Sequence, residues 1–186
     1  DLATREPWPT RHLHVLPDHH GNRSPRANPQ ARGMLSGLTL EGGQDALARV
    51  YLATLQALAY GTRHIVDSMN AERILIASES LGDAKYFIRR ACDYARERVV
   101  FGRPIGQNQG VQFPLARAHA DLVAAELVIR KACALFETER DCGAEANMGK
   151  MLAADAAWKA ADSCLQTFGG FGFAREYGIE RKWRET

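Results

Sequence analysis

The sequence predicts an all-α fold: an antiparallel up-and-down four-helix bundle that follows an irregular N-terminal segment. Apolar residues recur every three or four positions along three long stretches between residues 70 and 168, which is the period of one helix face. The same stretches are rich in alanine, a strong helix former that also lets packed helices approach closely. No stretch alternates strongly in the manner of a β-strand, so strands are not expected.

Residues 1–61 are expected to form an irregular or disordered segment with one short helix. Five of the seven prolines and four of the six histidines lie in the first 30 residues, without a helical or strand period. The histidines could bind a metal, but this composition favours an unpacked segment, and no metal site is predicted. A helix is expected over residues 45–60, capped by Asp45 and ended by Gly61. Its helically spaced apolar residues are Leu47, Tyr51, Leu55 and Leu58.

Residues 62–186 are expected to form the bundle, and three apolar stripes define its long helices. The first helix is expected to begin at Asn70, a good N-cap, and to run into Arg98. The first stripe holds Ile74, Ala77, Leu81, Ala84, Ile88, Ala91 and Ala95. The second holds Val111, Leu115, Ala118, Leu122, Ala125, Ile129, Ala132 and Phe136, and the third holds Met151, Ala154, Trp158, Ala161, Leu165 and Phe168. A fourth helix should follow the glycines at 169–172, with Ile179 and Trp183 facing inward, and the chain stops partway along it.

Composition excludes several classes of function. The net charge of +2 provides no strong field for nucleic acid or for an anionic membrane. No apolar run reaches the ~20 residues that a transmembrane helix needs. The cysteines form no C-x-x-C pair, so we interpret them as reduced core residues of an intracellular protein. They are Cys92, Cys133, Cys142 and Cys164.

The segment YARERVVFGRPIGQNQGVQ, residues 94–112, carries the most functional information. Pro104 cannot continue a helix, so a tight corner between two helices is predicted here. The corner holds an arginine, an aromatic ring and two amides: Arg98, Phe101, Gln109 and Gln112. Arginine suits forked hydrogen bonding to a pyrophosphate, and an aromatic ring can stack on a heterocycle. In the structural alternative, Arg98 ends a helix where a cation is favoured and Phe101 plugs the corner.

Two further motifs have both a structural and a functional interpretation. Asn70 and Glu72 suit the first turn of a helix, but Glu72 could also be a general base and Arg73 an anion anchor. The glycines of QTFGGFG, residues 166–172, can form a helix C-cap and turn, or can let backbone amides approach a ligand. The mixed charges of residues 175–185 are typical of a solvated helix face with pairs four residues apart.

Taken in order, four blocks resemble the C-terminal α-helical domain of the acyl-CoA dehydrogenase family. They are NAERILIA, YARERVVFGRPIGQNQGVQ, EANMGKMLAADAAWKAADSCLQTFGGFGF and REYGIERKWRE, and the resemblance covers roughly residues 62–186. It implies an FAD-dependent oxidoreductase that oxidises the Cα–Cβ bond of acyl-CoA thioesters to the enoyl-CoA, as in fatty acid β-oxidation. The N-terminal helical domain and the middle β-domain of the family have no counterpart in this sequence.

The resemblance also implies a set of cofactor-binding residues. Arg98 would reach the FAD pyrophosphate of a neighbouring subunit, and Phe101 and Gln109 would line the same cofactor. The glycine-rich segment would lie along the adenosine half of FAD through Gln166, Gly169 and Gly170.

The substrate-binding and catalytic residues follow from the same resemblance. Asn70 and Arg73 would lie near the CoA part of the substrate. Glu72 matches the base position of a minority of the family, typified by isovaleryl-CoA dehydrogenase. Most members carry the base beyond the last bundle helix, so both positions for the base stay open.

The implied partners are acyl-CoA, an electron-transfer flavoprotein as acceptor, and further copies of the chain in a dimer or tetramer. The implied location is the bacterial cytoplasm, with the mitochondrial matrix as the alternative. Two other functions stay open: a catalytically inactive helical module that only oligomerises, and a related flavin enzyme such as an acyl-CoA oxidase or a nitroalkane oxidase.

The origin of residues 1–61 is itself testable. The first lysine is Lys85, and a long Arg-, His-, Pro- and Ala-rich stretch without lysine is what an out-of-frame reading of GC-rich DNA produces. We expect residues 1–61 to be a truncated or frameshifted front end. Translating the upstream DNA in the other frames should then reveal a strand-rich middle domain, and its absence from every frame would contradict the hypothesis.

Overall fold

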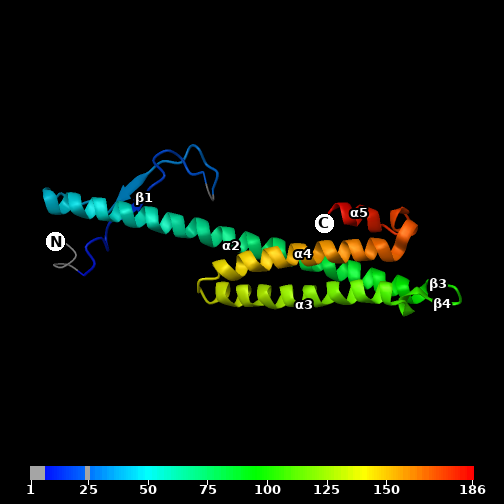
Figure 1. Ribbon diagram of the computed structural model, residues 1–186. Coiled ribbons are helices and arrows are strands. Elements are labelled where there is room, and N and C mark those ends of the chain that lie inside the picture. The colour runs from blue at the N-terminus through cyan, green and yellow to red at the C-terminus, as the bar shows by residue number, and fades with distance from the viewer. Residues whose placement is uncertain (1–6, 24–25) are drawn as a thin grey trace. The chain divides into compact units, whose positions relative to one another are not determined.

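The computed structural model describes residues 7–23 and 26–186, and expectations for residues 1–6 and 24–25 lie outside the described part. The chain divides into two compact units, Asp1–Met69 and Asn70–Thr186. One long helix, α2 (Gln44–Glu97), contributes to both units (Figure 1).

The first unit contains a pair of short strands that the sequence did not predict. Strand β1 (His14–Leu16) pairs antiparallel with β2 (Met34–Ser36), and Val15 lies opposite Leu35. Three residues are too few for a strand alternation to stand out from the surrounding loop. Within the described part of this unit, Ala53 is the one buried hydrophobic residue. The predicted stripe at Leu47, Tyr51, Leu55 and Leu58 is exposed, so it covers no core here.

Three predicted helix boundaries are wrong because α2 is continuous. Gly61 does not end a helix: it lies within α2, and a glycine at a partly exposed helix position costs only about 1 kcal/mol. Asn70 is not an N-cap, since it is buried inside the same helix. Asp45 lies inside the first turn, where its carboxylate is favoured by the helix dipole, rather than at the cap. The short helix over residues 45–60 is therefore the beginning of a longer one.

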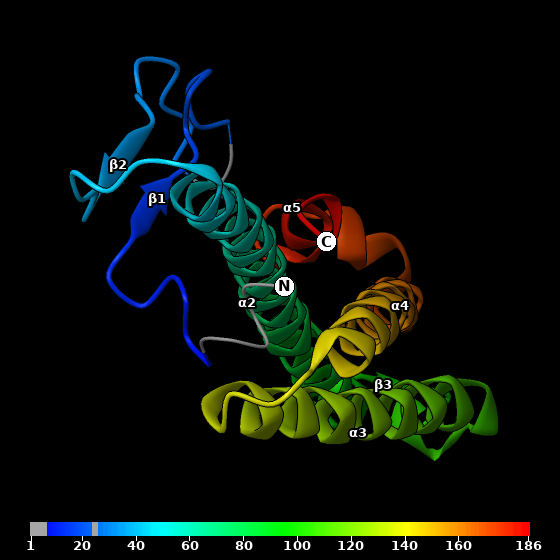
Figure 2. The same cartoon turned by 90° about the vertical axis from the view of Figure 1, so that its left-hand side faces the viewer.

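The second unit is the predicted helical bundle. It contains the remainder of α2, then α3 (Gln109–Glu137), α4 (Gly143–Phe168), the 3₁₀ helix η2 (Gly169–Phe173) and α5 (Ile179–Arg184). Helices α3 and α4 are joined by the short loop 138–142, so they run antiparallel and lie side by side (Figures 1 and 2). The all-α class is confirmed.

Alanine dominates the core of the second unit. The stripes predicted for α2 and α3 are confirmed, except that Phe136 is exposed. The stripe predicted for α4 is half wrong, because Met151, Ala154 and Trp158 are exposed. The buried face of α4 is instead lined by Ala153, Ala156, Ala157, Ala160, Ala161, Cys164, Leu165 and Phe168. Two neighbouring faces of α4 are both apolar, and only the face with small side chains fits the close packing.

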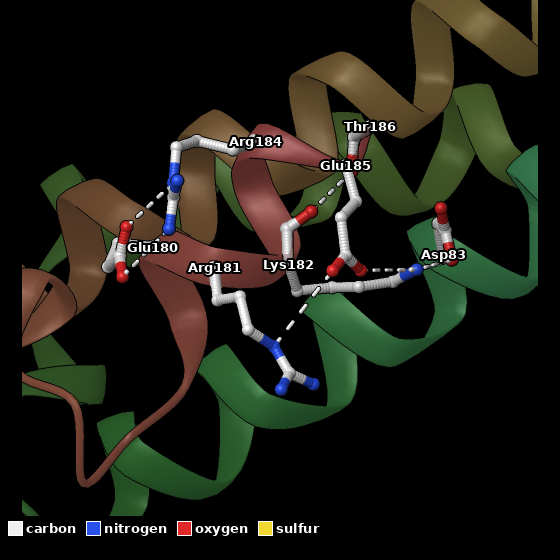
Figure 3. Close-up of polar contacts among 7 residues, drawn as sticks. All are labelled: Asp83, Glu180, Arg181, Lys182, Arg184, Glu185 and Thr186. Atoms are coloured by element: carbon white, nitrogen blue, oxygen red, sulfur yellow. Dashed lines mark hydrogen bonds and ion pairs between the residues drawn. The ribbon is translucent and has the colours of Figure 1, made fainter.

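Helix α5 is held against the bundle by the buried residue Ile179, by a contact between two tryptophan rings and by an ion pair. Ile179 is fully buried, and the Trp183 ring lies 5.2 Å from that of Trp158. Lys182 Nζ lies 2.8 Å from Asp83 Oδ1 on α2 (Figure 3). The hydrogen bond to Asp83 raises the pKa of Lys182, so its ammonium group stays charged at neutral pH.

The outer face of α5 carries the predicted charge pairs four residues apart. Arg184 pairs with Glu180 at 2.9 Å and Arg181 with Glu185 at 3.9 Å (Figure 3). All four cysteines are free, and burial raises the pKa of the Cys164 thiol to about 12. Among the described residues, no helix combines the length and apolar character that crossing a membrane needs.

The alanine packing predicts a strong asymmetry between two faces of α4. Ala156→Leu should over-pack the core and destabilise the second unit by about 1–3 kcal/mol, because Ala156 is fully buried. Hydrogen exchange of the most protected α3 and α4 amides should then become about 5- to 150-fold faster. The matched control is Ala154→Leu, the same change at an exposed position, which should leave exchange nearly unchanged. Equal effects of the two variants would contradict this packing.

Candidate cofactor and substrate site

The corner after α2 is a small hairpin rather than a direct helix-to-helix turn. Strands β3 (Val99–Val100) and β4 (Arg103–Pro104) pair antiparallel, followed by the 3₁₀ helix η1 (Ile105–Gln107). The two turn residues, Phe101 and Gly102, have φ values of 52° and 78°. Positive φ at both central residues is what a type I′ hairpin turn requires. These two-residue strands correct the expectation of a strand-free corner.

Phe101 does not plug the corner. Its side chain is 100% exposed, so the structural alternative in which the ring fills the corner is wrong. A non-glycine residue in the left-handed region costs about 1–2 kcal/mol. The chain therefore holds a fully solvated aromatic ring on a strained turn, which is a geometry suited to covering a flat ligand.

The two glutamines of the corner have different environments. Gln112 Nε2 donates a hydrogen bond of 2.7 Å to the carbonyl oxygen of Gly106, so this amide helps to hold η1 against α3. Gln109 is the first residue of α3 and is exposed. Both residues are exposed, and the amide of Gln112 differs in already donating to Gly106.

Arg98 links the corner to the glycine-rich segment after α4. Its guanidinium carbon lies 5.2 Å from the centroid of the Phe171 ring, within cation–π range. Just before it, the ring of Tyr94 stacks on that of Phe168 at 4.0 Å. The end of α2 and the end of α4 are therefore in contact.

The glycine-rich segment leaves its backbone open at this same end of the bundle. Gly169 has a φ of 57° and forms the C-cap of α4, and a Cβ added at Gly169 or Gly170 would meet nothing within 4 Å. Gln166, one turn earlier, is exposed. The predicted cofactor residues Arg98, Phe101, Gln109, Gln166, Gly169 and Gly170 lie on the segments that end or begin helices here, and the contact of Arg98 with Phe171 joins two of these segments.

The predicted substrate and catalytic residues lie near the start of α4. Asn70 is buried, and its amide nitrogen lies 3.7 Å from the position that a Cβ would take on Gly143. Arg73 is half-buried, and its Nη1 donates to Asn70 Oδ1 at 3.5 Å. Glu72 is exposed on the same stretch of helix. Asn70 is therefore placed to orient Arg73 rather than to face solvent.

One chain does not bring the predicted cofactor residues and the predicted catalytic residue together. Glu72 and the last residue of α2, Glu97, are separated by about 38 Å along the helix axis at ~1.5 Å per residue. If Glu72 acts next to a cofactor held by the residues after α2, these two parts of the site must therefore come from two copies of the chain or from another domain.

The aromatic residues behind Arg98 were missed by the sequence analysis. Phe171 and Tyr177 belong to no helical stripe, so periodicity gives them no weight. Their rings lie 5.8 Å apart, and Tyr177 also contacts Tyr94 and Phe168. The available signal was the spacing of aromatic residues around the glycines. Among the described residues, no group of three or more His, Cys, Asp or Glu could hold a metal ion.

Comparison with known proteins gives the chain a family. The family model described as acyl-CoA dehydrogenase, C-terminal domain, matches residues 59–186. An acyl-CoA dehydrogenase of Bacillus subtilis is 42% identical over 119 residues, which are 64% of this chain and 31% of that protein. Isobutyryl-CoA dehydrogenase of Bos taurus is 37% identical over 119 residues, 63% of this chain and 29% of that protein.

Solved structures agree with the sequence relatives. Butyryl-CoA dehydrogenase from Megasphaera elsdenii superposes with a TM-score of 0.63 at 29% identity, covering 66% of this chain and 32% of that one. A glutaryl-coenzyme A dehydrogenase bound to glutaryl-CoA gives a TM-score of 0.63 at 31% identity, covering 67% of this chain and 32% of that one. The chain spans about a third of the length of these proteins.

A second family model matches the N-terminal part. It is described as the C-terminal domain of the FGGY family of carbohydrate kinases and matches residues 2–85, less than half of the chain. The first model covers more than two thirds of the chain and agrees with the fold of its second unit. The chain therefore belongs to the acyl-CoA dehydrogenase family, through the helical C-terminal domain that its residues 59–186 form.

Proposed function

We propose that the second unit is the helical part of an FAD-dependent acyl-CoA dehydrogenase, which converts an acyl-CoA thioester to the enoyl-CoA. The observation that carries this proposal is the contact of Arg98, three residues before the exposed ring of Phe101, with Phe171 of the segment that holds Gly169 and Gly170. An arginine, a ring and uncovered backbone groups match the pyrophosphate, the flat ring system and the adenosine of FAD. Relatives named as acyl-CoA dehydrogenases support the reaction.

Each cofactor residue has a specific task in this proposal. FAD, when bound, supplies the hydride acceptor. Arg98 binds the pyrophosphate through forked hydrogen bonds, and Phe101 covers the cofactor with its ring. Gln109 donates a hydrogen bond from its exposed amide. Along the adenosine half, contacts come from Gln166, Gly169 and Gly170.

Glu72 is the proposed base, and it removes the α-proton of the thioester. The exposed carboxylate can reach a substrate that lies along α2. Arg73 binds a phosphate of CoA, and Asn70 orients Arg73 through its side-chain oxygen. The substrate is therefore bound at the opposite end of the bundle from the cofactor residues of the same chain.

This separation supports an oligomeric enzyme. The distance of about 38 Å between the two groups means that a second copy must supply the cofactor residues if Glu72 acts beside the flavin. We propose a dimer or tetramer, with electrons passing to an electron-transfer flavoprotein. A protein described with the electron transferring flavoprotein of Acidaminococcus fermentans is among the structural neighbours. The proposed location is the cytoplasm of a bacterium, with the mitochondrial matrix as the alternative.

Two alternatives remain distinguishable by experiment. A catalytically inactive oligomerisation module would assemble but show no turnover with any acyl-CoA. An acyl-CoA oxidase would consume oxygen in step with product formation. A nitroalkane oxidase also shares this fold, at 18% identity.

For the first unit we propose a separate relationship. Its match to a carbohydrate kinase C-terminal domain and its exposed apolar helix face support the idea that residues 2–69 are part of a kinase-like domain. Apolar side chains at 46–71% exposure on one helix face are typical of a surface that packs against further structure. These side chains are Leu47, Tyr51, Leu55 and Leu58. The residues proposed for the dehydrogenase function then all lie in the second unit.

The base assignment is tested in a hybrid enzyme. Residues 70–186 replace the matching part of the Bacillus subtilis acyl-CoA dehydrogenase, and turnover is measured with a panel of acyl-CoA substrates. Glu72→Gln should lower kcat by about 10²–10⁴-fold while flavin absorbance is retained, because the base is lost but the fold is not. Glu79→Gln, on the same helix and also exposed, is the matched control and should keep full turnover. If Glu72→Gln stays fully active, the base lies elsewhere.

The separation of the two units is tested by truncation. A chain that begins at Asn70 should keep the hydrogen-exchange protection of α3 and α4, because the buried cluster runs from Ala77 to Ile179 and includes no residue of the first unit. A chain that begins at Lys85 loses Ala77, Leu81 and Ala84 from that cluster and should lose the protection. Loss of protection in the chain that begins at Asn70 would show that the first unit is required for folding.

A further inference from the structure

The contact between Arg98 and Phe171 joins two segments that are far apart in the sequence. Arg98 follows the last residue of α2, whereas Phe171 lies in η2, after α4. The guanidinium carbon lies 5.2 Å from the ring centroid. This distance is within the ~6 Å over which a cation is attracted to the face of an aromatic ring.

The Phe171 ring is itself fixed by a chain of aromatic contacts. It meets the Tyr177 ring edge-on at 5.8 Å and 62°. Tyr177 contacts Phe168 at 5.4 Å, and Phe168 stacks on Tyr94 of α2. Arg90 Nη2 also donates a hydrogen bond of 3.2 Å to the backbone oxygen of Tyr177. The ring beneath Arg98 therefore belongs to a cluster anchored on both α2 and α4.

The geometry leaves the hydrogen-bonding edges of Arg98 available. A guanidinium packs on a ring with its flat face, and its N–H donors point outward in the plane. Within residues 7–23 and 26–186, no carboxylate pairs with the Arg98 side chain. An arginine that is held in place but keeps its donors free loses less conformational entropy when it binds an anion.

We propose that Phe171 is a positioning residue whose ring holds the Arg98 guanidinium ready to bind a pyrophosphate group. This inference rests on the proposed dehydrogenase function, in which that pyrophosphate belongs to FAD. Gly169 and Gly170 lie in the same turn as Phe171, and a Cβ added to either would meet nothing within 4 Å. Phe171 acts through Arg98 and does not itself need to contact the flavin ring.

The test uses the whole 186-residue chain and two measurements on Arg98. The order parameter and chemical shift of the Arg98 Nε–Hε group are followed by NMR, with Arg98→Ala identifying the signal. Inorganic pyrophosphate is then titrated, with sulfate at matched ionic strength as the reference anion. Three variants are compared: Phe171→Leu removes the ring, Phe171→Tyr keeps it, and Phe173→Leu removes an exposed ring of the same turn.

We expect Phe171→Leu to lower the Arg98 order parameter, to abolish its ring-current shift and to weaken pyrophosphate binding about two- to fivefold. Phe171→Tyr and Phe173→Leu should behave as the unmodified chain. Arg98→Ala should weaken binding about tenfold or more.

Several results would overturn the proposal. One is an unchanged Arg98 order parameter in Phe171→Leu, and another is reduced order without a change in pyrophosphate affinity. Failure of the unmodified chain to bind pyrophosphate through Arg98 would do the same. None of these measurements depends on turnover. Failure of the Glu72 test for the dehydrogenase function can therefore be distinguished from failure of Phe171 to hold Arg98.

Discussion

The second unit depends on how closely α2, α3 and α4 approach one another through small side chains. A Cβ added to Gly149 would lie 3.0 Å from Cγ1 of Ile129, so α3 and α4 are in near-backbone contact there. Ala84, Ala125 and Ala160 are fully buried in the same cluster. Contacts of this kind are individually weak, and they stabilise a fold because there are many of them. They also fix the positions of the helices relative to one another, and the candidate cofactor site is built from the helix ends.

The division between core and site follows from that arrangement. The core uses residues without hydrogen-bonding groups, whereas the polar and aromatic residues gather where helices stop. Tyr94 and Phe168 stack at the ends of α2 and α4, and this contact brings η2 beside the corner hairpin. Arg98 and Phe101 are then presented by short segments that rigid helices position. A binding site on loops that are held by packed helices is a common solution, because the loops can carry function without disturbing the core.

Periodicity predicted the bundle well where only one face of a helix is apolar. It failed on α4, because Trp158 and Ala157 are adjacent, both are apolar, and the sequence does not say how much space the neighbouring helix leaves. Local signals at Gly61 and Asn70 also failed, since the helical preference of the surrounding residues outweighs one glycine or one asparagine.

For the site, the sequence supplied the residue types but not their distances. The exposure of Phe101, the contact between Arg98 and Phe171, and the separation of about 38 Å along α2 depend on three-dimensional packing. The resemblance to a family identified candidate residues, and the structure showed which of them one chain can bring together. Asn70 illustrates the difference. An asparagine suits a helix cap or a ligand contact, but this one is buried beside Gly143 and is placed to orient Arg73.

The alanine faces restrict how this domain can vary over evolution. At a buried alanine such as Ala84 or Ala160, glycine is the one smaller replacement, and it weakens the helix by about 1 kcal/mol. Every other replacement adds volume, and over-packing of a core typically costs about 1–3 kcal/mol. Few substitutions are therefore neutral at these sites. Neutral substitutions are expected on the outer faces, where residues such as Met151 and Trp158 are exposed. A lineage can thus acquire new surfaces, and with them new partners, while its interior sequence stays almost fixed.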